Sequence, residues 1–153
     1  MVIDDIITYL KAKIAEDEDL PEIGVIEAYQ YGHKVKSTEL QVQFIRHSEF
    51  TRYTTFDGIQ VSVCPLTINI YATQQTIETI VDDEIITETI SAQRMSYLLA
   101  HKVTEWLNYR DLIDNITDVI GATNANYIPG QPFDTGTLLY QSVVRVDLHL
   151  KNI

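Results

Sequence analysis

The sequence predicts an α+β fold, with a mostly antiparallel sheet, helices packed on it and a projecting β-hairpin arm. Alternating apolar and polar residues recur along several segments, most clearly in residues 140–151, which is the pattern of a half-buried strand. Apolar residues at spacings of three and four mark residues 3–14 and 91–120 as helical. Two β-branched runs flank three acidic residues within residues 76–90, which is typical of a hairpin.

The composition indicates one acidic domain. The chain has 153 residues, 45% of them apolar, with 22 acidic against 11 basic residues and a net charge of −11. A domain typically holds about 100–150 residues, so we expect one core, and the apolar fraction is too high for a disordered chain. An acidic surface repels phosphate backbones and anionic lipid headgroups. We therefore expect protein partners, with no membrane and no sequence-specific nucleic acid.

The single cysteine, Cys64, cannot form an intrachain disulfide and fits no multi-cysteine metal pattern. A buried, inert thiol is favoured over a reactive one, because its sequence neighbours are strand-like and uncharged. The first five residues carry two acids where a secretory signal needs bases, and no apolar run approaches the roughly 20 residues that span a bilayer. We therefore expect a protein that stays in a reducing cytoplasm.

The opening helix, residues 3–14, must end before Pro21, because proline disfavours helical backbone at the preceding residue. The acidic run at residues 16–19 lacks the spaced ligands and the glycine turn of a calcium loop. We interpret that run as a solvated linker.

Three strands are predicted next. Residues 23–31 and 35–45 alternate on either side of Gly32, which predicts a hairpin. A third strand, residues 59–70, is interrupted by Pro65. Because proline cannot donate to a ladder, this position predicts a sheet edge or a bulge.

Residues 76–90 form the predicted arm, with its tip at residues 82–84. Isoleucine or valine stands on both faces, so packing one face on the parent core still leaves apolar surface exposed. One interpretation is that the arm contacts a neighbouring molecule, and the alternative is a hairpin wholly covered by the protein's own helices. The first interpretation predicts interface residues Ile77, Ile80, Val81, Asp82, Asp83, Glu84, Ile85 and Ile86.

Residues 91–120 carry the longest helical pattern, with Ser91 or Thr89 as N-cap and a break at Asn108-Tyr109. Large apolar residues at helical spacing are usually core, so we expect Trp106 to be buried against the sheet. The predicted stripe consists of Met95, Leu99, Val103, Trp106, Ile113 and Ile120.

Residues 121–136 hold three of the six glycines and two of the four prolines, which predicts a loop. Loops this long in compact domains usually carry function. Its candidate contact residues are Asn124, Asn126, Tyr127 and Phe133.

Catalytic motifs are absent from the sequence. It contains no glycine-rich phosphate loop, no histidine pair at zinc spacing and no Gly-x-Ser-x-Gly elbow. His101 and Glu105 stand one helical turn apart, which could orient a catalytic imidazole but is more often an ordinary surface contact. We therefore expect no catalytic residue, no cofactor and no metal.

The charge balance reverses locally between residues 29 and 53, where Lys34, Lys36, Arg46 and Arg52 outnumber two acids and alternate with aromatic residues. Such a stretch can bind single-stranded nucleic acid, but the excess is small in a protein at −11 and favours an acidic protein neighbour. A basic patch on one subunit and an acidic edge on the next suit head-to-tail association.

The order of these elements, including a middle strand that ends in residues 65–71 (PLTINIY), resembles the tail terminator and tail-to-head joining proteins of long-tailed bacteriophages. The resemblance covers nearly the whole chain and implies that residues 1–153 form a single tail-terminator-like domain. In that family an α+β subunit forms a hexameric ring that caps the tail tube and docks on the neck. Only the arm, residues 77–90, and the loop, residues 122–135, correspond in kind to the contact features of such rings.

The resemblance implies a non-enzymatic virion protein of the tail and neck, assembled in the host bacterial cytoplasm. Its implied partners are copies of itself, the tail tube protein and neck or connector proteins, with DNA passing through the ring lumen. Two alternatives stay open. One is another head-tail connector, a head-completion protein or a tail tube protein. The other is a cytoplasmic small-molecule-binding module or small enzyme, which should show a deep pocket with convergent polar groups.

Overall fold

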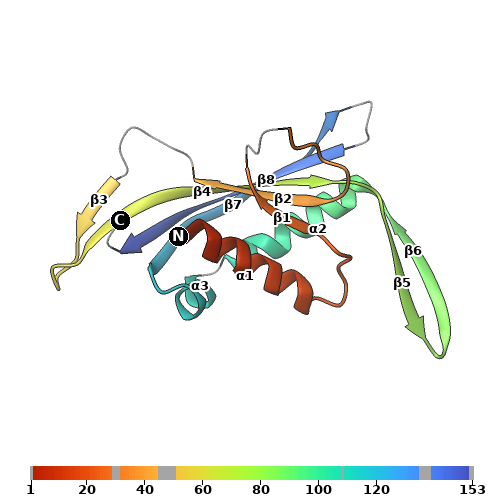
Figure 1. Ribbon diagram of the computed structural model, residues 1–153, viewed down its shortest axis with the longest axis horizontal. Coiled ribbons are helices and arrows are strands. Elements are labelled where there is room, and N and C mark those ends of the chain that lie inside the picture. The colour runs from red at the N-terminus through yellow and green to blue at the C-terminus, as the bar shows by residue number, and fades with distance from the viewer. Residues whose placement is uncertain (1, 29–31, 45–50, 108, 135–138, 152–153) are drawn as a thin grey trace.

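The computed structural model describes residues 2–28, 32–44, 51–107, 109–134 and 139–151. Within these residues the predicted α+β fold is confirmed, with the helices on one side of a mostly antiparallel sheet and a separate two-stranded arm (Figure 1). The elements in chain order are α1 (Val2–Glu16), β1 (Gly24–Glu27), β2 (Glu39–Phe44), β3 (Thr51–Thr54), β4 (Gln60–Ala72), β5 (Gln75–Val81), β6 (Glu84–Ile90), α2 (Ala92–Trp106), α3 (Tyr109–Asn115), β7 (Val119–Asp134) and β8 (Leu139–Lys151).

The opening helix ends at Glu16, before Pro21, as predicted. Its buried face consists of Ile3, Ile6, Tyr9, Leu10 and Ile14. The acidic run that follows is not a purely solvated linker, because the Asp17 carboxylate accepts a hydrogen bond from Lys102 Nζ of α2 at 2.5 Å. This ion pair, largely shielded from solvent, ties the end of α1 to α2.

The predicted hairpin between the first two strands is wrong, because β1 and β2 pair in parallel. Gly24 lies opposite Glu39, and Glu27 lies opposite Val42. The chain therefore runs back along the strands between them, as a parallel pair requires. Alternation determines which side of each strand is buried, and it leaves the direction of pairing open. Residues 29–31 and 45, which the prediction included, lie outside the described residues.

The main sheet has the strand order β1-β2-β4-β8-β7, and β3 pairs with the first part of β4. Along one side of β4, β3 pairs with residues 60–63 and β2 with residues 66–71, so Pro65 lies between the two partners. On its other side Pro65 lies opposite Asp147 of β8. The prediction of a sheet edge or a bulge at Pro65 fits this position, because no described residue of β2 or β3 pairs with Pro65.

The long helical segment begins as predicted. The Ser91 hydroxyl accepts a hydrogen bond from the Arg94 backbone N–H at 3.2 Å and so caps α2. α2 ends at Trp106 and α3 begins at Tyr109, which confirms the predicted break, although Asn108 lies outside the described residues.

The predicted apolar stripe is confirmed before the break, where Met95, Leu99 and Val103 are buried and Trp106 is partly buried and packs against the core. Beyond the break the stripe is wrong, because Ile113 is exposed and Ile120 belongs to β7. The break changes the rotational phase of the helix, so extrapolating one stripe across it selects the wrong side chains. The buried positions are Leu107, Leu112 and Ile116.

The predicted loop at residues 121–136 is also wrong, because residues 119–134 form the long strand β7 beside β8. The register of this pair shifts between Val119 and Gly121, between Thr123 and Asn126, and at two later points. Such shifts let glycine, asparagine and proline stand in a strand that pairs only intermittently. Residues 135 and 136 lie outside the described residues.

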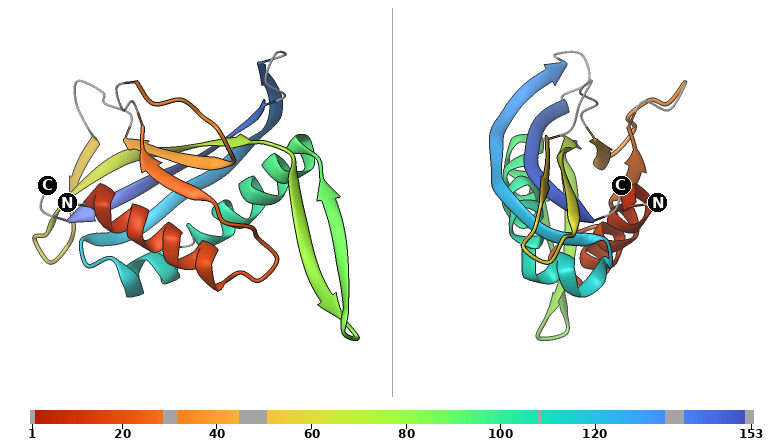
Figure 2. Two further views of the ribbon diagram at one scale, coloured as in Figure 1. Left: turned by 45° about the vertical axis from the view of Figure 1, so that its right-hand side comes forward. Right: turned by 90° about the vertical axis from the view of Figure 1, so that its left-hand side faces the viewer.

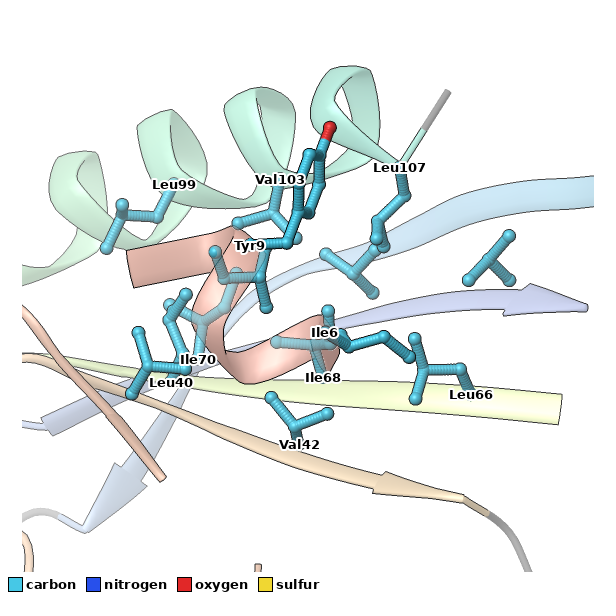
Figure 3. Packing of buried hydrophobic residues seen from close by; sticks show 14 of the residues in the cluster. Ile6, Tyr9, Leu40, Val42, Leu66, Ile68, Ile70, Leu99, Val103 and Leu107 are labelled. Atoms are coloured by element: carbon cyan, nitrogen blue, oxygen red, sulfur yellow. The ribbon is translucent and has the colours of Figure 1, made fainter. Parts of the chain in front are cut away.

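The core lies between the sheet and the helices (Figures 2 and 3). Alternate residues of β8, such as Val144, Val146 and Leu148, are buried on the helix side, as the alternation predicts. Across this core the Tyr9 hydroxyl donates to the Trp106 carbonyl oxygen at 2.5 Å. Among the helices of the described residues, none combines the length and the apolar character that a membrane span requires. Figure 3 shows Ile6, Leu40, Val42, Leu66, Ile68, Ile70, Leu99, Val103 and Leu107 converging.

Candidate functional site

The predicted arm is present as β5 and β6, joined by a two-residue turn at Asp82-Asp83. Val81 lies opposite Glu84, and the two turn residues have φ angles of 51° and 63°. Two positive φ angles in a two-residue connection define a type I′ turn, which matches the twist of a hairpin. The predicted tip is confirmed at both aspartates, whereas Glu84 already pairs within β6.

Apolar side chains stand exposed on both faces of the arm. Ile80 and Ile85 lie opposite each other on one face and are 75% and 68% exposed. Val81 and Ile86 stand on the other face and are also exposed. The interpretation in which the protein's own helices cover the hairpin is therefore wrong for these side chains. The Ile77 side chain lies outside the described set.

The base of the arm is anchored in the body. The buried Thr38 hydroxyl accepts hydrogen bonds from Gln75 Nε2 at 2.7 Å and from the Thr73 backbone N–H at 3.1 Å. Ile90, opposite Gln75, is buried. The arm thus leaves the body from a defined position (Figure 2).

The charge on the arm has one sign. Residues 75–90 contain no lysine or arginine. Near the base, Glu88 lies 3.6 Å from the Arg94 guanidinium, and both side chains are exposed, so this pair contributes little. The arm therefore presents apolar and acidic chemistry together. Its acids are Glu78, Asp82, Asp83, Glu84 and Glu88.

The three described residues of the predicted basic stretch do not lie together. Lys34 and Lys36 lie in the connection from β1 to β2, whereas Arg52 lies on β3 at one end of the body (Figures 1 and 2). Arg46 lies outside the described residues. The two lysines border a polar hollow with a volume of about 440 Å³, lined by Gly32, His33, Lys34, Lys36, Ser37 and Glu39.

The candidate contact residues in the segment that was predicted to be a loop lie on β7, at the edge of the main sheet. Asn124 has a φ of 57°, and its amide donates to Asp147 Oδ2 of β8 at 3.0 Å. Asn126 and Tyr127 are exposed, which leaves them available for a partner. Phe133 belongs to β7, and its side chain lies outside the described set.

An exposed aromatic residue that sequence reasoning missed is Phe56, in the turn between β3 and β4. The turn is closed by hydrogen bonds from the Gly58 N–H to the Thr55 oxygen at 3.0 Å and from the Thr55 N–H to the Ile59 oxygen at 2.9 Å. Phe56 is fully exposed, at 111% of the reference area. The available signal was an apolar residue inside the turn sequence TFDG, where polar residues are typical.

His101 and His149 contact other side chains through their ring nitrogens. His101 Nε2 lies 3.2 Å from Glu105 Oε1 on the exposed side of α2, which fits the ordinary surface contact. The His149 ring bridges the Tyr53 hydroxyl, 2.8 Å from Nδ1, and the Thr123 hydroxyl, 3.0 Å from Nε2. In the described part of the chain, no three side chains of His, Cys, Asp or Glu converge as metal ligands would. His47 lies outside that part.

Cys64 is buried, as predicted. Burial raises the pKa of the thiol, and the charge of Arg52 opposes this shift only in part. Because the thiolate is the nucleophilic form, a raised pKa makes the side chain less reactive near neutral pH.

Among the described residues, four surfaces are open to a partner: the apolar and acidic arm at one end, the Phe56 turn at the other, the β7 edge with Asn126 and Tyr127, and the lysine-bordered hollow. Each is a surface for contact rather than an enclosed site. A functional assignment must rest on the chemistry of these surfaces, since no protein-family model matches the chain and no curated protein matches its sequence.

Proposed function

We propose that this chain is the ring-forming subunit that ends a phage tail tube and joins it to the neck. The observation that supports the proposal is the exposed arm, which carries Ile80 and Ile85 on one face and Val81 and Ile86 on the other. A two-stranded hairpin alone is marginally stable in water. Burying its apolar surface against a partner contributes roughly 25 cal/mol per Å², so the arm is suited to assembly.

The proposed partners are other copies of the chain in a closed ring, a hexamer by the family resemblance, together with the tube protein and neck proteins. Such a ring needs a head-to-tail contact, in which two different surfaces of each subunit meet. The protein acts by shape and buried surface, so the proposal assigns no catalytic residue and no cofactor. It places the chain in the virion, with DNA passing through the lumen.

The proposal is tested by electron microscopy of particles from the encoding phage after disruption of this gene. Tails of uncontrolled length are the expected result, because nothing would then stop polymerisation of the tube. Tails of normal length that stay detached from heads would instead assign the chain to another connector role. Intact, infectious particles would contradict the proposal.

Charge reversal on the arm tests the same proposal within the protein. The variant replaces the exposed Glu78, Glu84 and Glu88 with lysine and keeps Asp82 and Asp83, because lysine would be strained at these two positive-φ turn positions. The body should stay folded, since exposed substitutions usually change stability by about 0.5 kcal/mol or less. Tail completion should nevertheless fail. The matched control replaces three exposed acids outside the arm, at Glu16, Glu18 and Asp19, and should complete tails normally. Equal yields from both variants would show that the arm is not the contact.

A further inference from the structure

We propose that the turn between β3 and β4, with Phe56 at its tip, docks on the β5–β6 arm of the next copy of the chain. The inference rests on the proposed ring and names the contact that repeats around it. The molecule that covers the arm is a second copy of this protein.

The Phe56 turn is built as a fixed projection. Besides its two backbone hydrogen bonds, the Thr55 hydroxyl accepts from the Ile59 N–H at 3.1 Å, and Gly58 adopts a φ of +82° that favours glycine. Tyr53, on the neighbouring strand, is 41% exposed. An aromatic side chain held fully in solvent by an ordered turn loses little conformational freedom on docking, and exposed aromatic residues are frequent anchors of interfaces.

The arm offers apolar area of matching kind. Ile80 and Ile85 form a cross-strand pair on one face, close to the tip, and both are mostly exposed. The β3–β4 turn and the arm lie at opposite ends of the long axis of the molecule (Figures 1 and 2). Two complementary surfaces at opposite ends produce a head-to-tail contact, which closes into a ring when the rotation between subunits permits.

Basic residues outnumber acids among the named side chains around the turn, which suits an acidic partner. Arg52 on β3 is exposed, and Lys151 of β8 lies opposite Val61 of β4, next to that hairpin, whereas the turn itself carries one exposed acid, Asp57. The arm carries only acids, so two arms would repel each other in a two-fold contact. The hollow beside Lys34 and Lys36 could also attract the acidic arm, but its lining is polar. An arm docked there would leave Ile80 and Ile85 without an apolar contact.

The experiment measures molar mass in solution for two variants and their mixture. Phe56→Asp removes the projection and keeps the arm, whereas the double variant Ile80→Asp/Ile85→Asp removes the apolar pair and keeps the projection. Each variant alone should associate about 30-fold more weakly than the native chain, or worse, as expected for loss of an interface anchor. The one-to-one mixture should form a dimer and nothing larger, because only one intact contact remains.

Controls separate this contact from other causes of lost assembly. Tyr97→Asp changes an exposed aromatic residue on α2 and should assemble like the native chain. Circular dichroism should show the native fold for every variant. A Phe56→Asp chain that assembles normally, or a mixture that forms no dimer, would overturn the proposal. So would a Lys34→Glu/Lys36→Glu chain that loses assembly while Phe56→Asp keeps it.

Disulfide trapping tests the contact even where the native chain stays monomeric in dilute solution. Chains with Phe56→Cys and Ile80→Cys, mixed and oxidised, should cross-link faster than a control mixture of Tyr97→Cys and Ile80→Cys. Equal rates would overturn the contact. If the chains pair head-to-tail but gene disruption leaves the tails normal, the proposed function alone is rejected. If gene disruption affects the tails but the Phe56→Asp variant completes them normally, the contact alone is rejected.

Discussion

Two buried serines differ in whether the side-chain hydroxyl makes a hydrogen bond, so mutating each should change stability in opposite directions. Ser96 and Ser142 are both completely buried. The Ser96 hydroxyl donates to the Gln93 carbonyl oxygen at 2.8 Å, whereas the Ser142 hydroxyl has no partner among the described residues. Since an unpaired buried polar group costs about 1–3 kcal/mol, Ser142→Ala should raise the free energy of unfolding by about 1 kcal/mol. Chemical denaturation measures this change.

The matched control is Ser96→Ala, which should lower the free energy of unfolding by about 0.5–1.5 kcal/mol because it removes a satisfied hydroxyl. If Ser142→Ala destabilised the protein as much as Ser96→Ala, a buried water or another group would have to satisfy the Ser142 hydroxyl.

Tyr9 predicts how stability falls at alkaline pH. Burial chiefly, with the charges of Asp111 and Glu16, raises the pKa of this phenol from 10.0 to about 12. The folded state therefore holds the proton more tightly than the unfolded state, and the free energy of unfolding falls as pH rises from 10 to about 12. Tyr9→Phe should lower stability near neutral pH, because the bond to the Trp106 oxygen is lost, and should flatten that alkaline fall. An unchanged slope would contradict this origin.

At the scale of elements, the arm and the body are separable. Gln75 lies opposite Ile90 at the base, so a two-residue Asn-Gly turn can join them in place of residues 76–89. The described side chains in that segment are exposed, so the shortened protein should keep its free energy of unfolding within about 1 kcal/mol. Assembly should be lost. A loss of more than about 2 kcal/mol in denaturation would show that the arm packs on the body.

At the scale of the whole molecule, the net charge of −11 opposes assembly, because subunits repel beyond the contact itself. Raising the ionic strength from about 0.01 M to 0.15 M shortens the screening length from roughly 30 Å to 8 Å. We therefore expect association to strengthen with salt over this range, measured by light scattering at fixed protein concentration. Association that weakens steeply would indicate a contact held mainly by ion pairs rather than by Phe56 and the isoleucines.

Local periodicity in the amino-acid sequence was enough to identify three parts of the fold. The alternation in residues 140–151 identified β8 and its buried face, and the spacing in residues 3–14 identified α1. The β-branched runs and acids of residues 76–90 identified the arm and its tip. Periodicity suffices for these elements because it determines which side of an element is apolar.

Other features depend on residues far away in the sequence and became visible only in the folded chain. β1 and β2 pair in parallel, and the glycine- and proline-containing β7 is a strand because β8 supplies its ladder. The exposure of Phe56 and the separation of Arg52 from Lys34 likewise follow from where the chain folds back. Pairing direction and exposure are set by contacts between residues far apart in sequence, and a local pattern carries no record of them.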